Sequence, residues 1–326
     1  MKKNLLIGLL ACCVLIVGGA AKFWKGRTAR ASDSHSLPEL VQGCKDAVNA
    51  MKSGKGTVKV HNISYGYQDD TRKTLETEET YTVAFDGPKY RISGEQLYIK
   101  NELAVGEYPI LPGTKLDVNI AFDGESLMSY ESRLRTGRIG PSTIPEMASL
   151  QNSKMVNSVL VIPPGGRVGR GGTGQGVQRI DLYPSLPVDE AYKGLRIARR
   201  ESLNGHGCVV VERVIEGKGL TLTREFWVDP DRGFTVPRVR EWAEGGPVHN
   251  RVITFEANAE LRDYGNGVWG PAKYTYEQNQ PDGNGGIRPD YRYETTYEPD
   301  FRLNVPVTAE DLTIKLPPGV LMQVVD

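Results

Sequence analysis

The stretch Arg224-Glu225-Phe226-Trp227-Val228-Asp229-Pro230-Asp231-Arg232-Gly233, followed by Phe234-Thr235-Val236-Pro237-Arg238-Val239-Arg240, decides the fold class of this chain. Leu220, Leu222, Phe226 and Val228 alternate with polar neighbours at the period of a strand that buries one face. Asp-Pro-Asp-Arg-Gly supplies turn chemistry, because proline fixes φ and glycine tolerates positive φ. The alternation resumes at Phe234 and Val236, so the segment predicts a β-hairpin.

The same alternation of strand and turn fills most of the chain. In the second half we expect strands over 207–216, 219–228, 234–242, 249–262, 268–278 and 290–298. No fixed-period repeat and no helical crossover interrupts the series, which indicates an antiparallel sheet rather than a βαβ fold. The sequence therefore predicts a mainly β protein.

Two segments carry a helical period instead. Leu37, Leu40, Val41 and Cys44 begin a pattern that predicts an amphipathic helix over 37–52, with Ser36 as N-cap and Gly54 marking the end. Residues 143–157 carry a second helical pattern. From Gly56 onward the period is two, and the apolar residues change face near His61-Asn62, which predicts a β-bulge.

The N-terminus reads as an export signal. Lys2 and Lys3 precede an apolar run over residues 5–21, and a polar tether follows. Three outcomes remain open: cleavage among the small residues 18–21, retention of residues 5–21 as a membrane anchor, and lipidation at Cys12 in Leu9-Leu10-Ala11-Cys12. We expect residues 1–31 to be this signal or anchor and residues 32–326 to be a single β domain, exported to the periplasm or cell envelope.

Composition and motifs argue against nucleic-acid binding and against catalysis. The 326 residues include 40 basic and 40 acidic ones, so no footprint for a polyanion is visible. The G-x-G-x-x-G match at 169–174 lies in a Gly-rich loop over 163–176 and does not open a helix, which favours a linker. Four scattered histidines give no metal spacing, and His206 with Cys208 lacks a third, orienting group. We expect no cofactor, no metal and no enzymatic activity.

Two further sets of residues leave alternatives open. Cys44 and Cys208 form one disulfide outside the cytoplasm, or serve as two small buried hydrophobic residues. Five tyrosines at even spacing on one expected hairpin form an ordinary cross-strand ladder, or the wall of a groove for an apolar ligand. They are Tyr274, Tyr276, Tyr291, Tyr293 and Tyr297.

In order, these pieces resemble the periplasmic lipoprotein carriers of the LolA/LolB-like family. The resemblance rests on the N-terminal helix and strand over 37–66 and on a set of short motifs. The motifs are Phe85-Asp86-Gly87-Pro88-Lys89-Tyr90-Arg91, Asp123-Gly124-Glu125-Ser126-Leu127-Met128-Ser129-Tyr130, Phe226-Trp227-Val228-Asp229-Pro230 and Leu316-Pro317-Pro318-Gly319-Val320. Together they span roughly residues 36–326.

The resemblance implies an unclosed antiparallel β-barrel, or half-barrel, with short helices over its concave face and an apolar cavity for lipid or lipoprotein acyl chains. The alternation of apolar and polar residues along each strand predicts which residues line the cavity, but it does not decide which face of the sheet is the inner one. The expected lid is helix 144–155 with Met147. The expected ligand-binding residues are Phe85, Ile92, Phe122, Met147, Phe226, Val228 and Phe255. The alternative on the same fold is a membrane-anchored envelope sensor, or a module that binds an envelope protein.

Overall fold

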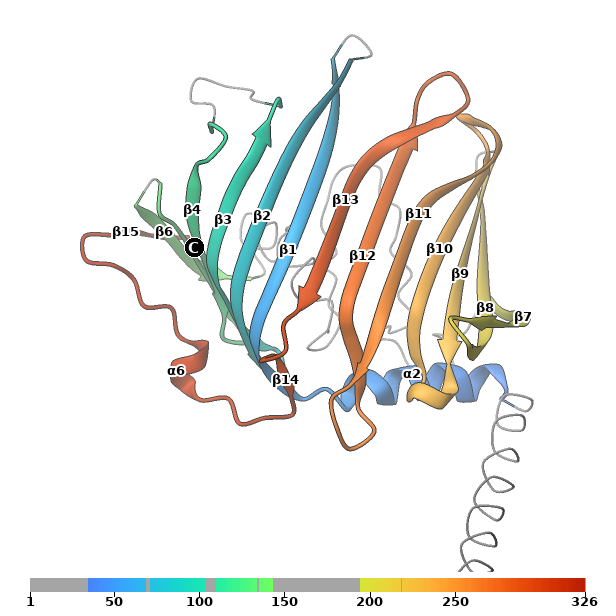
Figure 1. Cartoon of the computed structure of the whole chain (residues 1–326), viewed down its shortest axis with the longest axis horizontal. Helices are drawn as coiled ribbons and strands as arrows, with labels where there is room; N and C mark the ends of the chain where they lie inside the picture. Colours follow the sequence, from blue (N-terminus) through green and yellow to red (C-terminus); the bar gives the residue numbers. More distant parts are fainter. Residues whose placement is uncertain are drawn as a thin grey trace, which may run out of the picture.

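The chain forms one large, curved β-sheet that does not close on itself (Figure 1). The computed structural model describes residues 35–68, 71–103, 110–133, 135–142, 194–217 and 219–325. The prediction of a mainly β half-barrel with an N-terminal helix is confirmed. The expected leader over 1–31, the lid helix with Met147 and the Gly-rich loop over 163–176 lie outside the described residues.

The described part contains a long N-terminal helix, a 3₁₀ turn, a short C-terminal helix and the strands of the sheet. In chain order these are α2 (Leu37–Asn49), β1 (Ser53–Gln68), β2 (Thr71–Asp86), β3 (Lys89–Asn101), β4 (Lys115–Phe122), β5 (Ser126–Glu131), β6 (Thr136–Pro141), β7 (Leu195–Leu203), β8 (His206–Gly217), β9 (Leu220–Asp229), η1 (Pro230–Arg232), β10 (Thr235–Gly245), β11 (Val248–Asp263), β12 (Trp269–Pro281), β13 (Ile287–Tyr297), β14 (Arg302–Leu303), α6 (Ala309–Leu312) and β15 (Leu321–Val324).

Two runs of sequential neighbours make up the sheet. The spatial order is β15-β6-β5-β4-β3-β2-β1-β13-β12-β11-β10-β9-β8-β7, and β14 also pairs with β1. Short turns join most neighbours, as the hairpin pattern predicts. The pairing of β1 with β13 joins the two runs, and its register sets Val58 opposite Tyr297 and Ser64 opposite Tyr291.

The pairing of β15 with β6 is parallel, so the prediction of a wholly antiparallel sheet is wrong at this edge. No hairpin connects these two strands, and nothing local forces the chain to reverse direction. The segment before β15 runs along the outer face instead. There, Arg91 of β3 donates to the backbone oxygens of Glu310 and Thr313. The short helix α6 therefore lies on the outer face, where the half-barrel prediction expected short helices on the concave one.

The N-terminal helix is confirmed, with corrections at its end and in the next strand. Ser36 caps α2 in a capping box with Glu39, but the helix stops at Asn49, and Gly54 belongs to β1. The predicted bulge at His61-Asn62 is wrong, because β1 pairs with β2 without interruption from Ser53 to Gln68. The apolar residues beyond this point, such as Tyr67, simply occupy the outer face, where the Arg288 guanidinium lies 3.9 Å from the Tyr67 ring centre.

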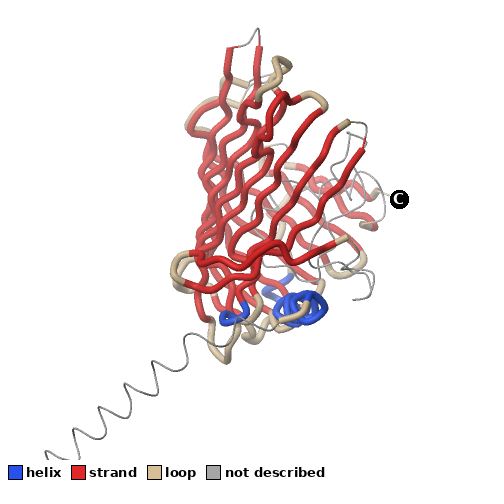
Figure 2. The backbone as a smooth tube through the Cα atoms, turned by 90° about the vertical axis from the view of Figure 1, so that its right-hand side faces the viewer, coloured by secondary structure: helices blue, strands red, loops and turns tan. Residues whose placement is uncertain are grey.

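Helix α2 runs across the strands at one end of the sheet and covers part of its concave face (Figures 1 and 2). Leu40, Val41 and Cys44 pack against Phe226 and Val228 and against the neighbouring valines of β8. Burying each large apolar side chain contributes about 1.5–3 kcal/mol, so this contact fixes the helix to the sheet. Within the described ranges, no helix has the length and hydropathy needed to cross a bilayer.

Candidate functional site: the concave face of the sheet

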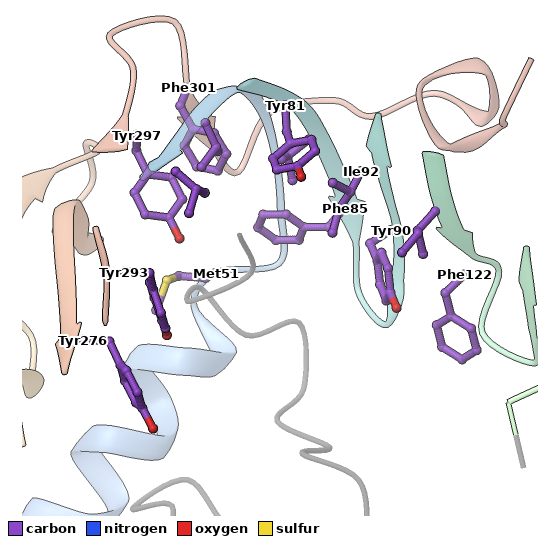
Figure 3. Packing of buried hydrophobic residues seen from close by; sticks show 14 of the residues in the cluster. Met51, Tyr81, Phe85, Tyr90, Ile92, Phe122, Tyr276, Tyr293, Tyr297 and Phe301 are labelled. Atoms are coloured by element: carbon purple, nitrogen blue, oxygen red, sulfur yellow. The ribbon is translucent and has the colours of Figure 1, made fainter. Parts of the chain in front are cut away.

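A continuous apolar lining covers the concave face from β5 to β11. Its side chains come from β1–β5, from β11–β14, and from Met51 and Phe301, and Figure 3 shows many of them. Val239 of β10 packs against this cluster and also against the cluster beneath α2, so the two are continuous. The sequence alone did not decide which face of the sheet is the inner one. In the structure, the inner face is the one that carries Phe85 and Phe226.

The structure brings three of the predicted lining residues together. Phe85 stands opposite Tyr90, which stands opposite Phe122, and Ile92 occupies the next inward position on β3. Phe85 and Ile92 are fully buried, and the Tyr90 and Phe122 ring centres lie 5.8 Å apart. These side chains form the apolar end of the lining, next to the turn between β2 and β3.

The remaining predicted residues have different surroundings. Phe226 and Val228 share the concave face, but α2 covers them, so they belong to the helix–sheet contact. Phe255 is partly buried on the same face, with its ring centre 5.0 Å from that of Tyr276. Met147 lies outside the described residues.

The expected tyrosine ladder is present on the concave face. The Tyr276 and Tyr293 rings are stacked, with centres 4.9 Å apart and an interplanar angle of 9°. The ring centre of Tyr293 lies 5.5 Å from that of Tyr291 and 6.0 Å from that of Tyr274. The cross-strand ladder is thus confirmed, and its role as a wall for a ligand stays a prediction. Because tyrosine offers an apolar ring with a polar tip, this half of the lining is less oily than the half around Phe85.

A buried carboxyl group lies beside the apolar lining on β2. Glu79 shares the inward face with Val60 of β1 and Gln96 of β3, which stand directly opposite it. Thr77 and Gln96 donate to its Oε1 at 2.8 and 2.9 Å, and the Tyr81 hydroxyl donates to its Oε2 at 3.0 Å. Burial raises the pKa of Glu79, while these hydrogen bonds act in the opposite direction.

A second charged group on this face is internally paired. Arg224 of β9 contacts the Glu241 carboxylate of β10, with Nε 3.0 Å from Oε2, and Thr254 donates to the other oxygen at 3.0 Å. Both side chains of the ion pair are buried. The Arg224 guanidinium also lies 5.7 Å from the Phe255 ring centre. Alternation alone gave no signal for this pair, because it depends on the register between β9 and β10.

The outer face of β7–β10 carries a small core that sequence reasoning missed. Trp227 points away from the concave face and is nevertheless buried, with Cys208 and Val210. The guanidinium groups of Arg199 and Arg238 lie 5.4 and 5.1 Å from its ring, and its indole nitrogen donates to Glu201. The arginines cover the ring, so a tryptophan on a solvent-facing position becomes buried. The sequence feature that could have indicated the burial of Trp227 is Arg238-x-Arg240, on the strand that follows the tryptophan.

The two cysteines of the β domain are free and buried, as one of the two alternatives predicted. Cys44 lies in the cluster beneath α2, whereas Cys208 lies in the outer core beside Trp227. Because the sheet separates them, no disulfide joins them. Burial raises the pKa of each thiol to about 12, so neither is a thiolate at neutral pH.

Two surface hollows lie apart from the predicted lining. One, of about 400 Å³, lies on the outer face between β3, β4 and α6 and is lined by Arg91, Asn119 and Lys315, among others. The other, of about 450 Å³, surrounds Trp242 and Arg251. Neither includes any of the seven predicted ligand-binding residues. Among the residues that the structure describes, no group of three potential metal ligands comes together.

No protein-family model and no curated protein matches this chain. Solved structures that resemble it include a DUF1329 family protein from Desulfovibrio piger, with 9% identity, 85% of this chain and 97% of that chain covered, and a TM-score of 0.37. An uncharacterized conserved protein from Thermus thermophilus has 8% identity, 89% and 99% coverage and a TM-score of 0.31. A porin-like protein from Bacteroides uniformis has 7% identity, 74% and 97% coverage and a TM-score of 0.20. Likenesses at TM-scores this low carry no functional inference.

Proposed function

We propose that this chain is a non-enzymatic binding or carrier protein that holds lipid or lipoprotein acyl chains against the concave face of its sheet. The observation that carries the proposal is the continuous apolar and aromatic lining of that face on a sheet that does not close. A closed small barrel fills its interior with its own side chains, whereas the strands of this sheet do not close around its lining.

The energetics suit a ligand with few polar features. Burying an acyl chain contributes about 0.8 kcal/mol per methylene group, so a lining such as Phe85, Ile92 and Phe122 needs no specific polar motif to bind it. The high pKa of the two buried thiols supports a role without nucleophilic catalysis at these cysteines.

Export and membrane attachment belong to the same proposal. The apolar run over residues 5–21 directs the chain to the envelope, where it is cleaved, retained or lipidated. In this setting the ligand is a lipid or a lipoprotein, and the resemblance to the LolA/LolB-like carriers points to the same class of cargo. Sequencing the mature N-terminus separates a released carrier from an anchored protein.

The test measures acyl-chain binding by the full chain and by two matched variants. A fluorescent fatty acid is titrated into wild type, into Val118→Trp and into Val214→Trp. Val118 lies on the concave face and packs against the apolar lining, whereas Val214 is exposed on the outer face of β8. The same bulky residue is therefore added to either side of the sheet.

We expect saturable binding by wild type and by Val214→Trp, and about tenfold weaker binding by Val118→Trp, equivalent to ~1.4 kcal/mol. Native mass spectrometry of the gently extracted full chain should also show co-purified lipid. Absence of saturable binding in wild type, or equal binding by the two variants, would contradict the proposal. A circular dichroism spectrum of each variant confirms that the sheet has formed.

A further inference from the structure

Glu79 differs from the other buried carboxylates of the described residues because it has no ion pair. The others each have an arginine: Glu212 has Arg196, Glu225 has Arg199, Asp229 has Arg232, and Glu241 has Arg224. Glu79 is 4% exposed and, within the described part of the chain, accepts hydrogen bonds from uncharged groups alone. A buried carboxylate is costly without a counter-ion, and the rest of the molecule supplies one in each comparable case.

Several hydrogen-bond donors and one spare acceptor oxygen surround the Glu79 carboxyl group. Thr77, Tyr81 and Gln96 donate to the carboxylate and thereby favour its charged form. Asn62, which also donates to Glu79, has a buried side-chain oxygen that accepts no hydrogen bond. Tyr293 stands opposite Asn62 on the neighbouring strand. A carboxylate, a spare amide oxygen and an aromatic ring form a suitable environment for an ammonium group.

The lining next to Glu79 is apolar along one direction of the strand. Inward positions Tyr81, Val83 and Phe85 follow it on β2, and all are buried. Six residues of strand separate Glu79 from Phe85, which corresponds to about 20 Å. One end of this path thus carries a hydrogen-bonded carboxyl group, and the other end carries apolar side chains.

We propose that the concave face binds an amphiphile with a cationic amine, whose ammonium group pairs with Glu79 while its hydrocarbon part lies along Val83 and Phe85. This inference rests on the proposed function and names the chemical class of the ligand: a lipid or lipid-like molecule with a positively charged nitrogen. The ligand supplies the counter-ion that the described chain does not.

The experiment compares ligands of equal chain length in competition with a fluorescent fatty acid on the full chain at neutral pH. The probes are decylammonium, decanol and decanoate, which share a ten-carbon chain and carry a positive, a neutral and a negative head group. The variants are Glu79→Gln and Glu78→Gln. Glu78 is adjacent on β2 and exposed on the outer face, so the control removes the same charge one residue away.

We expect wild type and Glu78→Gln to bind decylammonium about tenfold more tightly than decanol or decanoate. Glu79→Gln should lose this preference and retain its affinity for decanol. Decanol binding without an ammonium preference in wild type, or a preference that survives in Glu79→Gln, overturns the inference and leaves the proposed function intact. Failure of wild type to bind decanol and decanoate at all refutes the proposed function itself.

A second measurement needs no variant. An apolar carbodiimide modifies protonated carboxyl groups in oily surroundings, and peptide mass mapping locates the modification. We expect decylammonium at saturation to protect Glu79 of wild type from modification. Full modification of Glu79 in its presence would overturn the inference even if Glu79→Gln does not fold.

Discussion

Replacing Arg224 with methionine should be among the most damaging single changes to the concave face. Methionine fills a similar space, so the main loss is the charge that faces Glu241. In wild type these two side chains are 7% and 4% exposed. The Thr254 hydroxyl, 3.0 Å from Glu241 Oε1, is the remaining hydrogen-bond partner of that carboxylate among the described residues.

The magnitude follows from the unpaired carboxylate. Removing one partner of a buried ion pair destabilises a protein by about 3–5 kcal/mol, since the other charge stays buried without compensation. Loss of the cation–π contact with Phe255, at 5.7 Å in wild type, adds roughly 0.5–1 kcal/mol. The double variant Arg224→Met/Glu241→Met removes both charges. It should recover most of the loss, and the remaining difference of about 1–2 kcal/mol is attributable to the lost Thr254 hydrogen bond and the lost cation–π contact.

Urea unfolding of the full chain, followed by circular dichroism, measures these differences. With a denaturant slope of about 3 kcal/mol per molar, a loss of about 4 kcal/mol lowers the midpoint by about 1.3 M. Lys315→Met is the matched control, because it removes the cation of an exposed pair with Glu310, whose side chains are 74% and 75% exposed. That control should change stability by less than about 1 kcal/mol.

Two results would refute the reasoning. A loss of less than about 1 kcal/mol in Arg224→Met would mean that the Glu241 carboxylate is not held in a water-poor site. Equal destabilisation of the single and double variants would mean that packing, and not the charge left behind, sets the loss.

Three further predictions concern other parts of the fold. Leu40→Ala should destabilise the chain by about 2–5 kcal/mol in urea unfolding, because Leu40 is fully buried beneath α2; a change below about 1 kcal/mol would contradict the docking of this helix. A water-soluble thiol reagent at mildly alkaline pH should leave Cys44 and Cys208 unlabelled until urea is added, since burial raises the pKa of each thiol to about 12. Peptide mass mapping locates the label, and labelling of either cysteine in the folded chain would contradict this prediction. The backbone amide of Thr308 and the ammonium of Lys55 lower the pKa of Asp311 from 3.8 to about 2, so its stabilising contribution is present above pH 3.8 and is lost as the pH falls through about 2. Hydrogen exchange across 309–325 should therefore stay slow at pH 4, and release of this segment at that pH would count against the assignment.

Local features of the chain predicted most of its strands. The run from Leu220 to Val228 alternates at period two, and the turn after Asp229 contains a proline and Gly233, whose φ of +68° suits glycine. The strands expected in the second half agree with β8–β13 to within a few residues. Ser36 was likewise identified as the cap of α2. Periodicity, turn chemistry and capping involve neighbours in sequence, so they can be read without knowing the fold.

Contacts between strands that are distant in the sequence could not be predicted from these local features. The outer face of β9 was expected to contact solvent, yet Trp227 is buried there under arginines from β7 and β10. Glu79 belongs to the acidic run Glu76-Thr77-Glu78-Glu79, and it became a buried carboxyl group when β1 and β3 paired on either side of β2. Which members of such a cluster turn inward depends on register, and a shift by one residue would exchange them.

By itself, the sequence determined that this protein is a series of β-hairpins behind an amphipathic helix, because each hairpin is specified by its own alternation and turn. The tertiary structure alone decided that β1 joins β13, that β15 joins β6 in parallel and that Cys44 and Cys208 lie on opposite faces. It also decided that Glu79 is enclosed with no arginine paired to it among the described residues. These outcomes depend on register and burial between segments far apart in the chain, and such pairings are selected by the free energy of the assembled sheet rather than by any local pattern.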